Sequence, residues 1–160
     1  VTSVTRIPPS SVDPTIKNYH WLDLIAGMFE AYDRGSETGI LVDANNNILE
    51  GPGFNIFSLD SRGLHTPEEG ILKGITRGSV IDIANELQIT LSLSPVNLKE
   101  FEASDEIFIT STAGGVMPVT KINNKKISGG NVGNITRKIK NIYWERHKDP
   151  KWSSSVDEFL

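Results

Sequence analysis

Short apolar runs separated by tight turns constrain the fold of this chain more than any other feature. Residues 39–42, 54–59 and 64–66 are three such runs, and the stretches between them are rich in Asn, Gly and Pro. The stretch over residues 60–63 is short enough to join antiparallel neighbours, whereas parallel strands need a long crossover. Further strands are predicted over residues 1–7, 89–93, 107–110 and 116–122.

Three longer segments, residues 21–32, 76–87 and 135–144, repeat their apolar positions at helical spacing. A short helix is also predicted over residues 96–101. Strands therefore outnumber helices, and the strands are often spaced as hairpins. The sequence predicts an α+β domain, with a mixed and largely antiparallel sheet against which the helices pack. The length of 160 residues favours a single domain, residues 1–160.

The composition argues against several kinds of site and partner. The chain has no cysteine, which removes disulfides, thiolate metal sites and a cysteine nucleophile. Three histidines (His20, His65 and His147) are too widely separated for ligand spacing, so we expect no metal site. A net charge of −4 and a pI near 5.4 argue against nucleic acid. No apolar run approaches the ~20 residues that a membrane span needs.

Four segments have local patterns suited to chemistry. The first places Lys17 on the loop Pro14-Thr15-Ile16-Lys17-Asn18, just before the helix predicted at residue 21. A desolvated lysine is a good Schiff-base amine. A loop lysine is also commonly a solvated surface residue, and the spacing alone leaves both alternatives open.

The second segment is Glu50-Gly51-Pro52-Gly53-Phe54-Asn55. Two glycines around a proline make a stiff turn that lets the backbone approach a flat ligand while Glu50 points a carboxylate at it. A bulge or hairpin turn with Glu50 in solvent is the alternative.

The third segment, residues 70–77, runs from Gly70 through Gly74 into a predicted helix. Free backbone N–H groups and the Thr76 hydroxyl at a helix start can hold a phosphate. An ordinary threonine cap is the alternative. The spacing is not that of a P-loop, which disfavours a nucleoside triphosphate.

The fourth segment, residues 110–118, has consecutive hydroxyls and small residues at the end of an apolar strand. Hydroxyls and exposed N–H groups on such a turn suit an anion. A tight loop between two strands is the alternative.

In this order, the four segments resemble fold-type IV pyridoxal-phosphate enzymes. That group includes branched-chain and D-amino acid aminotransferases, aminodeoxychorismate lyases and R-selective amine transaminases. The resemblance extends from about residue 11 to residue 147 and is strongest to the R-selective amine transaminases. It is carried by Ser11-Val12-Asp13-Pro14-Thr15-Ile16-Lys17-Asn18, Gly27-Met28-Phe29-Glu30-Ala31, Glu50-Gly51-Pro52-Gly53-Phe54-Asn55 and Thr112-Ala113-Gly114-Gly115-Val116-Met117-Pro118.

The resemblance implies the larger, C-terminal domain of such enzymes, a pseudo-barrel that binds pyridoxal 5′-phosphate. Lys17 matches the lysine that forms the Schiff base and shuttles the substrate proton, and Glu50 matches the carboxylate paired with the pyridine nitrogen. Leu72 matches the side chain packed on the ring. The phosphate contacts match Gly74, Ile75, Thr76, Ser111 and Thr112. Pocket-lining positions match Trp21, Phe54, Ala113 and Gly114.

The resemblance also implies transamination between an amine or amino acid and a keto acid, in a cytoplasmic homodimer. The smaller N-terminal domain of the family has no counterpart in residues 1–160. A catalytically incompetent fragment is therefore one alternative, and a lyase of the same fold is another.

Overall fold

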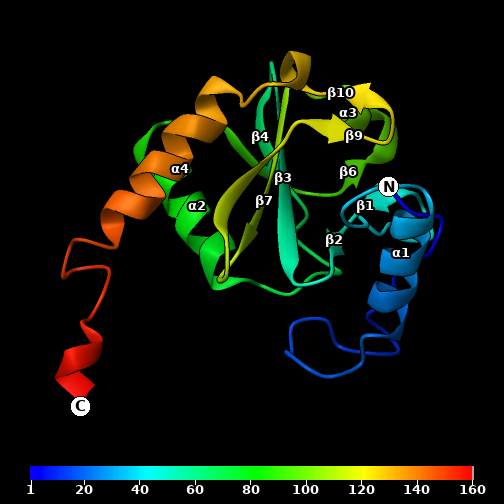
Figure 1. Ribbon diagram of the computed structural model, residues 1–160, viewed down its shortest axis with the longest axis horizontal. Helices are drawn as coiled ribbons and strands as arrows, with labels where there is room; N and C mark the ends of the chain where they lie inside the picture. The colour runs from blue at the N-terminus through cyan, green and yellow to red at the C-terminus, as the bar shows by residue number, and fades with distance from the viewer. Residues whose placement is uncertain (160) are drawn as a thin grey trace.

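The computed structural model describes residues 1–159 and is built around one six-stranded sheet (Figure 1). Five strands follow the order β5-β4-β3-β7-β8, and β2 pairs separately with β3. Only β4 and β5 pair in parallel, so the predicted α+β class and largely antiparallel sheet are confirmed. Within the described residues the sheet is open. The strands are β2 (Glu50–Gly51), β3 (Phe54–Asp60), β4 (Gly63–Thr66), β5 (Leu91–Leu93), β7 (Glu106–Ser111) and β8 (Gly115–Val119).

Two helices, α2 (Ile75–Glu86) and α4 (Asn134–Arg146), cover one face of this sheet (Figure 1). Phe57 and Phe108 lie opposite each other on β3 and β7, and their rings stack with centroids 5.0 Å apart. Val80, Ile83 and Ala84 of α2 are fully buried, as the predicted helix over residues 76–87 requires. Burying one such large apolar side chain contributes about 1.5–3 kcal/mol.

The opposite face of the sheet buries a second apolar cluster, which includes Ile48, Ile56 and Phe101. The bordering elements are β1 (Asn47–Ile48), β6 (Val96–Asn97), α3 (Leu98–Glu102) and the hairpin of β9 (Lys121–Ile122) with β10 (Lys125–Lys126). The short predicted helix starts only at Leu98 because the two preceding residues pair with β1. The Asn97 side chain then caps α3 by accepting the Lys99 N–H.

Helix α1 (Leu22–Asp33) lies on the side of the molecule away from α2 and α4 (Figure 1). It confirms the helix predicted over residues 21–32. Its buried positions include Leu24, Gly27 and Ala31. A Cβ on Gly39 would lie 2.7 Å from the Gly27 carbonyl oxygen. The backbone of α1 therefore lies in close contact with the backbone of the segment that leads to β1. This contact holds the middle of α1 close to that segment.

Two strands predicted from the sequence are wrong as regular elements. Residues 1–7 and 39–42 run side by side, but they form only isolated bridges at Thr5 and Val42. Two backbone hydrogen bonds join them, from the Thr2 N–H to the Ile40 carbonyl and from the Arg6 N–H to the Val42 carbonyl, and the Ser3 N–H donates to the Glu30 carboxylate of α1. The strand predicted over residues 116–122 is also divided, since the Thr120 carbonyl accepts the Ile127 N–H and the chain then turns into β9.

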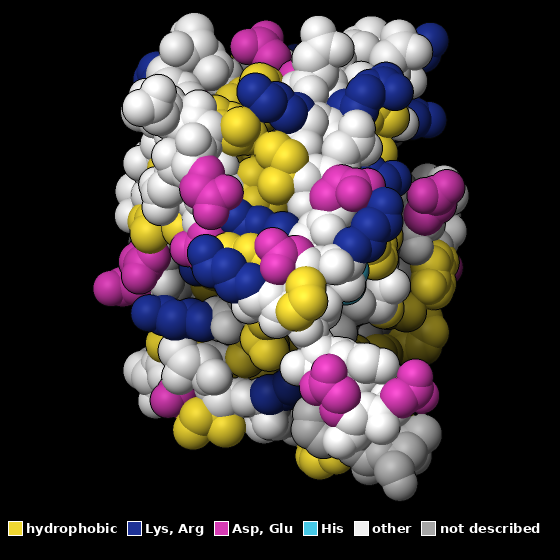
Figure 2. Space-filling model, turned by 90° about the vertical axis from the view of Figure 1, so that its left-hand side faces the viewer, with side chains coloured by type: hydrophobic (Ala, Val, Ile, Leu, Met, Phe, Trp, Pro, Cys, Tyr) yellow, Lys and Arg dark blue, Asp and Glu magenta, His cyan; other side chains and the backbone are white. Residues whose placement is uncertain are grey.

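The surface that carries α4 interleaves Lys and Arg with Asp and Glu side chains (Figure 2). Beyond α4, the Trp152 ring lies 4.1 Å beneath the Arg146 guanidinium. The described chain also contains two 3-10 turns, η1 (Ser128–Gly130) and η2 (Val156–Phe159). None of its helices combines the length and the apolar character needed to cross a membrane.

The turn between β2 and β3 generates a stability prediction. A Cβ on Gly51 would overlap both the Phe54 ring and the Gly39 carbonyl oxygen. Gly51→Ala should therefore lower the free energy of unfolding by about 2 kcal/mol or more, within the range for overpacking. Gly78→Ala is the matched control, because Gly78 lies within α2 with no atom near the new methyl group. It should raise stability by about 0.5–1 kcal/mol. Urea unfolding measures both, and equal effects would contradict the prediction.

Candidate active site

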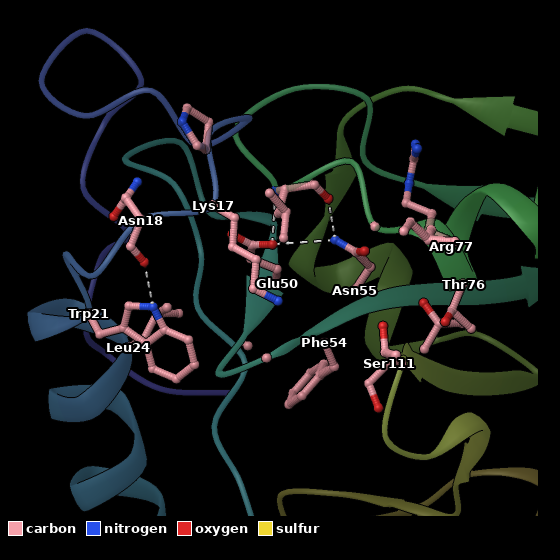
Figure 3. A pocket seen from close by; sticks show the side chains of 18 of the residues that line it. Lys17, Asn18, Trp21, Leu24, Glu50, Phe54, Asn55, Thr76, Arg77 and Ser111 are labelled. Carbon is pink, nitrogen blue, oxygen red and sulfur yellow. Dashed lines mark hydrogen bonds between the residues drawn. The ribbon is translucent and has the colours of Figure 1, made fainter. Parts of the chain in front are cut away.

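The four predicted segments meet around one cavity of about 140 Å³ (Figure 3). Its walls come from the loop before α1, the β2–β3 turn, the start of α2 and the turn after β7. Of the predicted site residues, the cavity is lined by Lys17, Trp21, Glu50, Phe54, Leu72, Gly74, Ile75, Thr76, Ser111 and Thr112.

Ala113 and Gly114, which the resemblance places in the substrate pocket, do not line this cavity, and their role stays a prediction. The Gly114 N–H donates to the Ser111 hydroxyl at 3.0 Å, which folds the turn back on itself. A Cβ on Gly114 would overlap the Met117 sulfur. The small residue is therefore needed beside Met117 within the turn.

Glu50 is buried, with 5% of its surface exposed, so the alternative of a carboxylate in solvent is wrong. The Arg6 guanidinium lies 3.1 Å from Oε1. Oε2 accepts the Leu72 N–H at 3.0 Å and the Asn55 amide at 3.3 Å. Burial raises the pKa of Glu50, and the Leu72 N–H and the Arg6 charge oppose that rise only in part.

Arg6 connects Glu50 to a second buried carboxylate. Its Nη1 lies 2.6 Å from Asp23 Oδ2, and the same oxygen accepts the Ile7 N–H at 2.8 Å. Asp23 also accepts the Leu24 N–H in the first turn of α1. Burial raises the pKa of Asp23, but the Ile7 and Arg6 hydrogen bonds outweigh it and leave the pKa lowered. The network therefore holds one guanidinium between two carboxylates.

Sequence reasoning missed Arg6 and Asn55 as site residues. Arg6 lies in the strand predicted over residues 1–7, and no local pattern indicates that it pairs with Asp23 and Glu50. Asn55 did leave a signal, because it is a polar residue inside the apolar β3 run. Its amide donates to the Leu72 carbonyl at 2.8 Å and so holds the loop before α2 against β3.

The start of α2 lies at the other end of the cavity from Lys17 (Figure 3). Gly74 is the N-cap residue and offers no side-chain cap, so the alternative of an ordinary threonine cap is wrong. Within residues 1–159, the N–H groups of Ile75, Thr76 and Arg77 have no acceptor. A Cβ on Gly74 would overlap the Asn55 side-chain oxygen, so glycine is required at this close approach.

A further polar group at this end of the cavity has no partner. The Thr110 hydroxyl is buried and forms no hydrogen bond within the described residues. Thr110 is 2% exposed and precedes Ser111 at the end of β7. A buried polar atom without a partner costs about 1–3 kcal/mol, and a bound ligand can remove that cost.

Arg77 anchors the third residue of α2 in the wall of the cavity. Its Nη2 donates to the Pro67 carbonyl at 2.7 Å, and its Nε donates to the Thr66 hydroxyl at 3.3 Å. Burial lowers the pKa of Arg77, while the nearby Glu68 carboxylate opposes that effect. The guanidinium thus fixes the loop after β4 to the first turn of α2.

Lys17 is exposed on its loop, as the surface alternative expects. Its side chain nevertheless lies in the wall of the cavity, beside Glu50 (Figure 3). The Trp21 ring closes the same side, and its Nε1 donates to the Asn18 carbonyl at 3.0 Å. The amine is therefore reachable from solvent and close to the buried carboxylate.

The profile of the amino-transferase class IV family matches residues 1–122. The chain belongs to the class IV aminotransferase family. A Methanocaldococcus jannaschii protein with the provisional name branched-chain-amino-acid aminotransferase is 36% identical over 158 residues. That match covers 96% of this chain and 54% of the relative. The branched-chain-amino-acid aminotransferase of Pseudomonas aeruginosa is 30% identical, over 80% of this chain and 42% of the relative.

Solved structures of class IV aminotransferases have the same fold. The branched-chain aminotransferase of Thermoproteus uzoniensis, solved with norvaline, is 34% identical with a TM-score of 0.88. It matches 95% of this chain and 52% of its own length. The Thermobaculum terrenum enzyme in its pyridoxal-phosphate form is 29% identical, also with a TM-score of 0.88, over 94% of this chain and 52% of its own. The chain spans about half the length of the relatives it matches.

These relatives are branched-chain aminotransferases. The resemblance to fold-type IV aminotransferases is therefore confirmed. The finer likeness to R-selective amine transaminases stays a prediction.

The raised pKa of Glu50 predicts a distinctive dependence of stability on pH. Because the folded pKa lies above the unfolded one, Glu50 favours folding fully below its unfolded pKa of ~4.3. That contribution is lost as the pH rises through the folded pKa. The difference in unfolding free energy between wild type and Glu50→Gln should therefore fall over this window and then level off. Urea titrations between pH 2 and 8 measure it.

Asp60→Asn is the control with the opposite sign. The Arg62 guanidinium holds the pKa of Asp60 well below its usual range. Its contribution to stability is therefore present above pH ~4 and is lost in more acid solution. A Glu50→Gln difference that grew with pH would contradict the raised pKa of Glu50.

Proposed function

We propose that residues 1–160 form one cofactor-binding domain of a pyridoxal-phosphate aminotransferase. The observation that carries this proposal is a single cavity lined by a lysine, a buried carboxylate and an uncapped helix start. The amino donor would be an amine or amino acid, and the acceptor a keto acid. The proposal includes a cytoplasmic location, which comes from the family resemblance alone.

The start of α2 suits the phosphate group of the cofactor. Three free N–H groups, the Thr76 hydroxyl and the positive end of the helix dipole favour an anion there. Ser111 and Thr112 approach from the turn after β7. The buried Thr110 hydroxyl adds a polar atom that lacks a partner in the described chain. These groups fit a phosphate better than an uncharged ligand.

Glu50 suits the pyridine nitrogen of the cofactor. Its carboxylate is held by Arg6, Asn55 and the Leu72 N–H, so its position is fixed before a ring N–H approaches. Pyridoxal phosphate, when bound, supplies an aldehyde that captures amines and a ring that withdraws electrons from the substrate Cα. A protonated ring nitrogen strengthens that withdrawal, and a buried carboxylate favours the protonated state.

Lys17 suits the attachment of the cofactor and the movement of the substrate proton. Its exposed amine reaches the cavity from a loop, so it can move between two positions without disturbing α1. Leu72 and Phe54 line the cavity and offer apolar contacts to a flat ring. Trp21 restricts the entry of water from the side of α1.

Covalent trapping tests the proposal. Incubation with pyridoxal phosphate followed by borohydride should add one cofactor to the chain, and peptide mapping should locate it on Lys17. Lys17→Ala should abolish the adduct and its near-visible absorbance band. Lys138→Ala, which removes an exposed amine from α4, should leave both unchanged.

The products of turnover distinguish the candidate reactions. Amine transfer that depends on an added keto acid supports an aminotransferase, whereas elimination without a keto acid would identify a lyase of the same fold. An adduct on Lys17 with no turnover of either kind would favour the incompetent fragment. An undiminished adduct in Lys17→Ala would contradict the role of Lys17.

The proposal includes a homodimer with α1 at its interface. Leu22, Phe29 and Tyr32 lie on one stripe of α1 and are 75%, 62% and 51% exposed. Contiguous exposed apolar side chains of this size mark contact surfaces. A second copy is the simplest occupant, because the same stripe on two chains can pack against itself.

Phe29→Lys should shift the protein from dimer to monomer, because it buries a charge in the proposed contact. Sedimentation velocity across a range of concentrations measures the change. Val156→Lys is the control, since Val156 is 72% exposed and lies far along the chain from α1. A wild-type chain that is monomeric at every concentration would contradict the dimer.

A further inference from the structure

Tyr143 of α4 reaches the start of α2 from behind the cavity. Its hydroxyl lies 3.5 Å from the Thr76 Oγ1, and the two residues are 67 positions apart in the sequence. Both are buried, with exposed fractions of 8% for Tyr143 and 4% for Thr76. Within the described chain, each hydroxyl has the other as its only hydrogen-bonding partner. The pair therefore forms an isolated polar contact between two helices.

The Tyr143 ring is held firmly in place. Trp144 and His147 pack edge-on against it, with centroid distances of 5.3 Å and 4.8 Å. Gly115, at φ 63°, leaves the room that the ring needs, because a Cβ there would lie 2.8 Å from Tyr143 Cε1. The hydroxyl thus has little freedom to turn away from Thr76.

The contact offers a way to set where the Thr76 proton points. A threonine hydroxyl carries one proton and can also accept hydrogen bonds. If the Tyr143 hydroxyl donates to Thr76 Oγ1, the Thr76 proton is free to point into the cavity. Thr76 would then donate to an anion at the start of α2 while it accepts from Tyr143. Two hydrogen bonds linked in this way strengthen each other.

We propose that Tyr143 is a positioning residue for the phosphate end of the cavity, acting by orienting the Thr76 hydroxyl. This inference rests on the proposed function, which puts the cofactor phosphate at the start of α2. Tyr143 itself does not line the cavity. Its hydroxyl would therefore act on a ligand through Thr76 and without direct contact.

Comparison of two ligands tests this role without any turnover. Tyr143→Phe keeps the packed ring and removes only the hydroxyl. It should weaken binding of pyridoxal phosphate to the apoprotein by about three- to ten-fold, the range of one net hydrogen bond. Binding of pyridoxal, which lacks the phosphate, should be unchanged. Absorbance or fluorescence titration measures both affinities, and the pyridoxal result also reports whether the variant folds.

A double-mutant cycle with Thr76→Val shows whether Tyr143 acts through Thr76. Thr76→Val should weaken pyridoxal phosphate binding, and Tyr143→Phe should add no further loss in that background. Additive losses, or equal weakening of both ligands, would overturn the positioning role in favour of a structural one.

Failure of the inference is distinguishable from failure of the proposed function. A wild-type preference for pyridoxal phosphate over pyridoxal that survives intact in Tyr143→Phe would overturn only the role of Tyr143. Wild-type protein that binds the two ligands equally would overturn the phosphate site itself, and the role of Tyr143 with it.

Discussion

The burial of the Glu50 carboxylate is the constraint on which the site depends. A buried carboxylate is costly unless it is paired and hydrogen-bonded. Here the compensation comes from three separate parts of the chain: Arg6 near the N-terminus, Asn55 on β3 and the backbone of Leu72 before α2. Removing one partner of a buried ion pair typically costs about 3–5 kcal/mol. The contacts that compensate the burial of Glu50 therefore also hold three segments of the cavity wall in fixed positions relative to one another.

The two ends of the cavity are built on opposite electrostatic principles. Around Glu50, one guanidinium is shared by two carboxylates, and these acceptor oxygens suit a protonated ring nitrogen. At the start of α2, free N–H groups and hydroxyls offer donors without a nearby carboxylate on the same turn. Asn55 joins the two ends, because its amide donates toward Glu50 while its oxygen packs against Gly74. A ligand with a basic nitrogen at one end and a phosphate at the other matches this polarity.

Local sequence patterns predict the helices and hairpins of this fold but not its long-range polar contacts. The α1, α2 and α4 segments follow apolar spacing, and β3 with β4 follows the turn at Arg62-Gly63. The first seven residues form only an isolated bridge to Val42, and no local pattern records that they run beside residues 39–42. Arg6 was missed for the same reason, since its partners lie 17 and 44 residues away. The resemblance predicts Ala113 and Gly114 as pocket residues, and this stays a prediction, because the described cavity does not reach their turn.

The net charge of −4 opposes an anionic ligand, so short-range groups must supply the attraction. At physiological ionic strength the Debye length is about 8 Å, and surface carboxylates beyond that distance have little influence within the cavity. Donors in direct contact with a ligand are screened far less. Binding at the start of α2 should therefore depend on how a few dipoles are oriented, and only weakly on the overall charge. A single hydroxyl such as that of Thr76 should then have a measurable effect on the affinity for the anion. A side chain that orients this hydroxyl should affect the affinity as well.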